Sequence, residues 1–102
     1  MEPAATGWTA VTQVTAAEVL GRMRATGHAD LHDNVVRFIR ALALEVGGTV
    51  ASGKPPPGLP VVIRGVTWYS LPVPEEPVFF NYSVYPMERQ IRVCDLIWVA
   101  TL

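Results

Sequence analysis

The spacing of apolar and polar residues differs between stretches of this 102-residue chain, and it predicts which stretches form strands and which form helices. Residues 8–14 alternate larger apolar with polar side chains over a short stretch, which is typical of a strand. Two later stretches place apolar residues three and four positions apart, as one face of a helix does. They comprise Ala16, Val19, Leu20 and Met23 in the first stretch, and Leu31, Val35, Phe38, Ile39, Leu42 and Val46 in the second. We therefore expect a strand followed by a pair of helices.

Short polar signals predict where these helices begin and end. Thr15 and Glu18 stand in a capping box, in which the Thr15 hydroxyl accepts from the Glu18 amide and the Glu18 side chain reaches back to the Thr15 amide. The first helix is expected to run to about residue 25 and to end at Gly27. Asp30 is expected to cap the second helix, and the glycine pair at 47–48 to end it.

The second half of the chain changes to a period of two, beginning after a connector. Residues 51–60 are rich in glycine and proline and predict a loop or extended connector inside the domain. Residues 61–63 and 67–73 predict two short strands on either side of Arg64-Gly65. The prolines at 72 and 74 indicate that the second strand ends there or lies along a sheet edge.

The last third has the clearest strand pattern. In residues 78–85, Val78, Phe80, Tyr82 and Val84 point to one face, and Phe79, Asn81, Ser83 and Tyr85 to the other. Residues 90–99 are almost continuously apolar, which predicts a central strand buried on both faces. There Asp95 would need a partner, and Cys94 would be a small core residue. The fold class expected is α+β, in the order β-α-α-β-β-β, with a two-helix hairpin packed on a small antiparallel sheet.

Composition narrows the class of protein. Half of the residues are apolar and 17% are charged, so the chain can bury one core, and residues 1–102 are expected to form a single domain. This apolar surplus also suggests that a partner covers part of the surface. The formal charge of −1 argues against strong nucleic-acid binding by charge alone. Apolar runs too short to span a bilayer, and a first segment without the apolar core of a signal peptide, predict a cytoplasmic protein without a membrane partner.

Five segments, taken in their order along the chain, carry a family resemblance. They are Trp8-Thr9-Ala10-Val11-Thr12, the helix ending at Gly47-Gly48, Gly53-Lys54-Pro55-Pro56-Pro57-Gly58-Leu59, Trp68-Tyr69-Ser70-Leu71-Pro72-Val73, and Phe79-Phe80-Asn81-Tyr82-Ser83-Val84. In this order the chain resembles the RelE/ParE superfamily of bacterial toxins, including its HigB branch, over nearly its whole length. The resemblance implies a type II toxin that an antitoxin segment neutralises by packing across the helices and the sheet.

The positions that serve catalysis in that superfamily are occupied differently here. The resemblance implies basic residues on the sheet of ribonuclease members, often an arginine that opens the strand corresponding to residues 79–84, and a His, Tyr or Arg near the C-terminus. Phe79 takes the first position, and residues 99–102 provide no such group. RNA cleavage would then lack its acid, its base and its phosphate clamp. Whether the chain is an enzyme stays open; if it is one, the resemblance implies an mRNA endoribonuclease.

Candidate site residues come mainly from the basic side chains outside the helices. These candidates for binding a phosphate or an acidic partner at one end of the sheet are Lys54, Arg64, Arg89 and Arg92, together with Tyr85. Tyr82 and Tyr85 lie next to Asn81 and can stack on a base, although cross-strand packing is the commoner role of such residues. Ordinary solvated charges are the alternative for the basic residues.

Two histidines offer the only metal-like spacing. His28 and His32 are four residues apart, as in helical metal sites. The helix start predicted at Asp30 lies between them, however, and spoils that geometry. We therefore expect no metal and no cofactor.

Two functions follow from these observations. The first is the toxin-like component of a toxin–antitoxin pair, with an antitoxin as partner and with RNA or a gyrase-like protein as target. Because the catalytic positions differ, binding is expected to be its mode of action, as in the ParE branch. The second is a non-catalytic protein-interaction domain of the same shape without toxicity. A homodimer stays open, and an enzyme for a small molecule ranks third because no pocket-forming constellation is visible.

Overall fold

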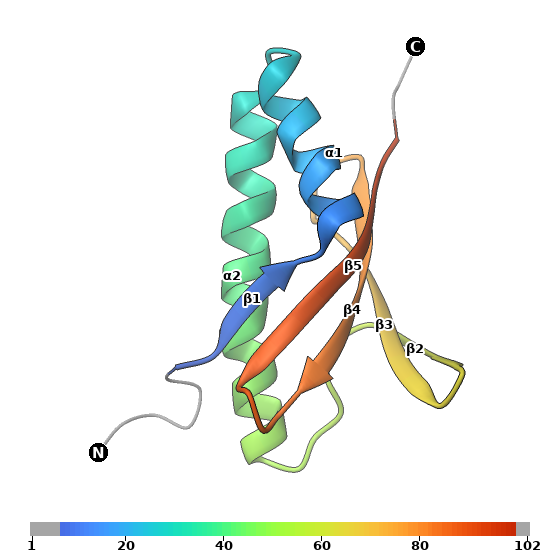
Figure 1. Cartoon of the computed structure of the whole chain (residues 1–102). Coiled ribbons are helices and arrows are strands. Elements are labelled where there is room, and N and C mark those ends of the chain that lie inside the picture. Colours follow the sequence, from blue (N-terminus) through green and yellow to red (C-terminus); the bar gives the residue numbers. More distant parts are fainter. Residues whose placement is uncertain (1–6, 100–102) are drawn as a thin grey trace.

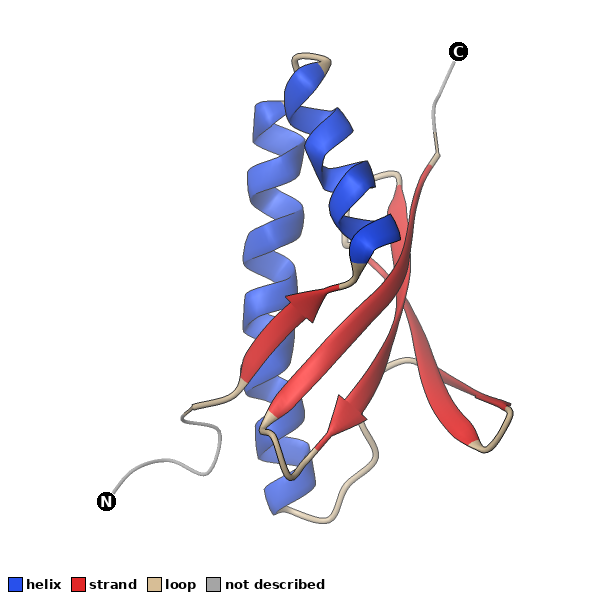
Figure 2. Cartoon of the chain, viewed as in Figure 1, coloured by secondary structure: helices blue, strands red, loops and turns tan. Residues whose placement is uncertain are grey.

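The computed structural model describes residues 7–99, which form one twisted sheet with two helices against one of its faces (Figures 1 and 2). The elements are β1 (Thr9–Thr12), α1 (Val14–Ala25), α2 (Ala29–Ala51), β2 (Leu59–Ile63), β3 (Val66–Pro72), β4 (Val78–Tyr85) and β5 (Gln90–Trp98). The α+β class and the order of a strand, two helices and then strands are confirmed. The expectations about a signal peptide in residues 1–7 and a catalytic group in residues 99–102 fall almost wholly outside the described part and stay predictions.

The sheet has the strand order β1-β5-β4-β3-β2. Hairpins join β2 to β3, β3 to β4 and β4 to β5, and these pairs are antiparallel. β1 pairs with β5 in parallel, with Thr9 opposite Gln90. The sheet is therefore mixed and not purely antiparallel, because the chain crosses over through α1, α2 and three strands before it returns beside β1.

One core lies between the helices and the sheet. It consists of Trp8, Ala16, Leu20, Met23, Val35, Ile39, Leu42, Ala43, Val46, Val73, Val78, Phe80, Tyr82, Ile91, Val93 and Leu96. Phe38 of α2 meets Phe80 of β4 edge to face, with ring centroids 6.1 Å apart. The predicted apolar faces of both helices and the inward face of β4 are confirmed.

The first helix begins two residues earlier than the capping box predicts. Gln13 is its N-cap and makes no side-chain capping bond. Thr15 lies inside the first turn, and its Oγ donates to the Cys94 carbonyl oxygen over 3.2 Å. The predicted capping box is therefore wrong, because a carbonyl of the neighbouring strand β5 takes the hydroxyl instead.

The second helix runs past the glycine pair that was expected to end it. It continues to Ala51, and a Cβ on Gly47 would lie 2.6 Å from Cδ1 of Trp8. Gly47 thus permits close packing and is not a stop signal. Asp30 is not the cap either: His28 holds that position without a capping bond, and Asp30 lies in the first turn.

Strand β5 is buried on one face only. Ile91, Val93 and Leu96 face the helices, whereas Asp95 and Ile97 are exposed. The prediction of burial on both faces is wrong because both helices lie against one face and no helix among residues 7–99 covers the other. Asp95 lies in solvent and so needs no buried partner. Cys94 is half-buried and outside the core, which corrects its expected place.

A bulge explains the misleading apolar run. Asn81 of β4 pairs with Asp95, but the next residue, Tyr82, pairs with Val93. Cys94 is the extra residue between them. It shifts the alternation of β5 by one position, so that Val93 and Leu96 both point inward.

The edge strand β2 is exposed on all five residues. It pairs only with β3, through a tight turn in which Arg64 has φ 52° and Gly65 φ 80°. Figure 2 shows this β2–β3 hairpin twisting away from β4 and β5.

Pro72 ends β3, which confirms one of the two predicted alternatives, namely that the prolines at 72 and 74 mark the end of this strand. Among residues 7–99, no helix is long and apolar enough to cross a bilayer.

Candidate binding surface on the open sheet face

The sheet face turned away from the helices carries side chains in rows that the strand register defines. Ser70 of β3 lies opposite Asn81 of β4, and Asn81 lies opposite Asp95 of β5. Three polar side chains thus cross the middle of the face in one line, which we call the polar row. Residues directly opposite one another in antiparallel strands have Cα atoms about 5 Å apart, so adjacent members of the row can bind one ligand together.

An apolar row lies beside the polar row. Pro72 pairs with Phe79, and Phe79 pairs with Ile97. Phe79 is 39% exposed and Ile97 43% exposed, which is high for large apolar side chains in a sheet. The open face therefore presents a polar strip with an apolar border.

A hollow of about 280 Å³ lies over the polar row. The β2–β3 hairpin contributes Val61, Ile63 and Trp68, and the polar row contributes its three members together with the bulged Cys94. β2 and β5 are separated by two strands, yet residues of both line the same hollow. The open face is therefore concave.

The electrostatics of the hollow are set by one carboxylate. Burial, and secondly the neighbouring charge of Asp95, raise the pKa of the Cys94 thiol above its ordinary value. The thiol is therefore neutral near pH 7, which argues against a nucleophilic role. Asp95 makes no ion pair with any residue between 7 and 99, so its charge is available to a ligand.

Two of the predicted site residues come together at the lower end of β4 and β5. The Arg92 guanidinium carbon lies 3.8 Å from the centre of the Tyr85 ring, and Arg92 Nε donates to Gln90 Oε1 over 2.8 Å. Stacking and this hydrogen bond hold the guanidinium in place. Ser83, paired with Arg92, is buried, and its Oγ has no hydrogen-bond partner among the described residues.

The other predicted basic residues lie in three separate exposed loops. Lys54 follows α2, Arg64 is in the β2–β3 turn and Arg89 is in the β4–β5 turn. These loops are at the same end of the sheet, the lower end in Figure 1, but the β2–β3 hairpin projects away from the other two. The structure joins only Arg92 and Tyr85 by direct contact.

Tyr82 is not available to stack on a base. Its side chain is fully buried, and its hydroxyl donates to the Pro57 carbonyl oxygen. Burial raises the pKa of this hydroxyl well above its usual range. Tyr82 therefore anchors the connector to the core.

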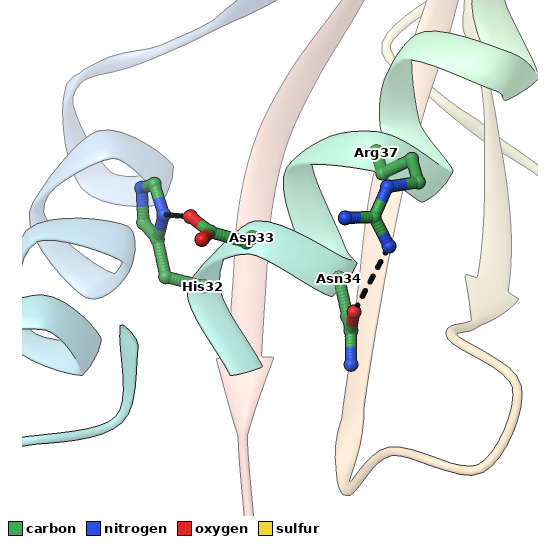
Figure 3. A network of polar contacts seen from close by, with 4 residues as sticks. All are labelled: His32, Asp33, Asn34 and Arg37. Atoms are coloured by element: carbon green, nitrogen blue, oxygen red, sulfur yellow. Dashed lines mark hydrogen bonds and ion pairs between the residues drawn. The ribbon is translucent and has the colours of Figure 1, made fainter. Parts of the chain in front are cut away.

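The two histidines make separate local contacts near the start of α2. His28 Nδ1 lies 3.1 Å from Thr26 Oγ1, and the His28 ring packs edge to face on Trp98. His32 Nδ1 is 3.0 Å from Asp33 Oδ1, a bond that lowers the pKa of Asp33 (Figure 3). The described residues contain no group of three or more His, Cys, Asp or Glu side chains arranged for a metal ion.

Comparisons with family models, with curated proteins and with solved structures found no match to this chain. The surface of the molecule is therefore the basis for its function.

Sequence reasoning missed the hollow for a definable reason. The alternation of β4 already placed Asn81 on the outer face, but Ser70 and Asp95 are joined to it only by register. The bulge at Cys94 sets that register on β5. The one available signal was a charged residue within an apolar strand, which we interpreted as a buried group in need of a partner.

Proposed function

We propose that this chain is a protein-binding domain that acts through its β2–β3 hairpin and open sheet face, and that its biological role is that of a toxin-like component held by an antitoxin. The observation that carries the proposal is the exposure of β2. Leu59 is 73% exposed, Val62 68% and Ile63 54%. Large uncovered apolar patches mark protein interfaces.

The incomplete helical layer supports a protein partner. α1 packs on β5, and α2 lies against β1 and β5. β3 keeps only partly buried residues against the core, and β2, at the edge beyond it, is exposed on all five residues. An added strand can pair with the free edge of β2, and an added helix can cover the hairpin.

The open face offers little support for RNA cleavage. Phe79 stands where a ribonuclease of the resembled superfamily has an arginine, and its side chain is in the apolar row. A carboxylate, Asp95, lies at the middle of the face and repels phosphate. The cluster of Arg92 and Tyr85 is the remaining group suited to an anion. A binding mode of action fits these residues better than an enzymatic one.

The toxin role predicts cytoplasmic action and a neighbouring gene for the partner. The test is induced expression in a bacterial host, alone and together with an adjacent short reading frame that has an antitoxin pattern. Growth arrest on induction alone, with rescue by the neighbour, is the expected result. Unchanged growth in both cases removes the toxin role and leaves the interaction domain without toxicity.

A variant pair tests the binding surface separately. Val62→Lys places a charge on the exposed hairpin, while Val14→Lys makes the same change at another apolar position, 75% exposed at the start of α1. Copurification of the neighbouring gene product should fall about tenfold or more with Val62→Lys, because an ammonium must be desolvated at the interface. Val14→Lys should leave it unchanged. Equal retention by both variants would place the partner elsewhere.

A further inference from the structure

The polar row differs from the rest of the open face in the chemistry that it offers. Asp95 provides two carboxylate oxygens, Asn81 an amide oxygen and Ser70 a hydroxyl oxygen. Trp68 lines the same hollow with an aromatic ring. A carboxylate with neutral acceptors and an indole is the set of groups that recognises an organic cation.

The charge of the hollow points in the same direction. Asp95 is its only ionised lining group, because the Cys94 thiol is neutral at physiological pH. The hollow therefore carries one uncompensated negative charge. A ligand that covers the exposed Asp95 carboxylate beside the apolar walls would exclude water from it, which strengthens the ion pair.

A guanidinium fits this arrangement better than an ammonium. Its planar fork of N–H groups can donate to a carboxylate in pairs and can stack on an indole at the same time. Asn81 and Asp95 are opposite one another, so a planar donor can reach both. An ammonium concentrates three donors at one point and does not use the indole face so fully.

The surroundings indicate that the guanidinium comes from a protein segment. Val61 and Ile63 form one wall, and the apolar row of Phe79 and Ile97 borders the other side. Apolar residues on both sides of an arginine would cover these surfaces. The free edge of β2 adjoins the same wall and can pair with an extended backbone.

We propose that the hollow over Ser70, Asn81 and Asp95 binds an arginine side chain of the partner, presented between apolar residues. This assignment rests on the proposed protein-binding function and names the chemistry of the partner at that surface. The negatively charged hollow is the opposite of the basic surface that RNA binding would require.

The test uses a short capped peptide with arginine between two leucines. The control peptide replaces arginine by citrulline, which has nearly the same shape but no charge. Binding is followed by NMR of the full chain, through the Trp68 indole and Asn81 side-chain amide signals. We expect these signals to shift on titration with the arginine peptide. The dissociation constant of the citrulline peptide should be at least about tenfold higher, because charge-assisted hydrogen bonds are lost.

Substitution of the carboxylate provides the second arm. Asp95→Asn keeps the shape of an exposed side chain and should reduce arginine-peptide binding about tenfold. The matched variant Glu88→Gln, in the exposed β4–β5 turn, should bind as the natural chain does. Occupancy should also protect the Cys94 thiol from iodoacetamide, since Cys94 lines the hollow.

Several results would overturn the assignment. They are equal binding of the two peptides, no effect of Asp95→Asn, signal changes centred away from Trp68 and Asn81, or no binding at all. Because the assay uses a defined peptide and purified protein, it can succeed when the growth test of the toxin role fails. It can equally fail when the hairpin variants show that a partner binds elsewhere.

Discussion

Single residues decide several features that their type alone does not reveal. Gly47 and Gly48 are adjacent in α2, and both have the residue type that ends helices. Only Gly47 is under packing pressure, because Trp8 lies against it. Nothing lies within 4 Å of a Cβ placed on Gly48. Comparing the two positions therefore distinguishes a glycine required by close packing from one that is not.

The same substitution at both glycines tests this difference. Gly47→Val should lower the free energy of unfolding by about 1–3 kcal/mol, the usual cost of overpacking a filled site. Gly48→Val should stay within about 0.5 kcal/mol of the natural chain, because a Cβ there meets no neighbouring atom. Urea unfolding followed by circular dichroism measures both. Equal losses would mean that the contact with Trp8 does not restrict position 47.

Polar residues with two available roles are also difficult to place from sequence. Thr15 has a local partner in the predicted capping box and a distant one in the carbonyl of Cys94, and the distant one is used. The apolar neighbours of Asp95 predict burial, but its side chain faces solvent. The local sequence does not predict which partner such a side chain uses, because the competing partner belongs to another element.

At the scale of elements, periodicity predicted the helices and the strands and missed their irregularities. The apolar face of α2 and the alternation of β4 follow directly from spacings of 3.6 and 2 residues. The bulge in β5 breaks the period of two, so the strand looked buried on both sides. The polar row depends on that bulge, which is why the candidate site was not visible in the sequence.

Deletions in β5 test the role of the bulge. Removing Cys94 leaves a regular strand in which Val93 and Leu96 still point inward, so the fold should be kept with a small loss of stability. Removing Arg92 also leaves a regular strand, but Val93 then points outward and Cys94 enters the core. Exposing a buried valine costs about 1.5–3 kcal/mol, so this deletion should be clearly less stable in urea unfolding. The opposite ranking would contradict the register between β4 and β5.

At the scale of the whole molecule, the two layers differ in extent. Five strands form the sheet, while the helices pack chiefly on β1 and β5. The apolar surplus in composition indicated that some surface needs a partner, and the structure locates exposed apolar residues on β2. Composition could not give that place, because the position of the β2–β3 hairpin at the edge of the sheet is a property of the assembled strands.

The exposed strand β2 predicts how the chain behaves without a partner. An exposed, uncharged edge strand can pair with another copy, although Pro60 removes one donor from β2. We expect weak, concentration-dependent self-association in sedimentation velocity, together with binding of a dye for exposed apolar surface. Val62→Lys should reduce both, because a lysine on the hairpin opposes edge pairing, and Val14→Lys should reduce neither. A chain that stays monomeric and free of dye at high concentration would show that β2 does not need cover, and would count against a partner at this surface.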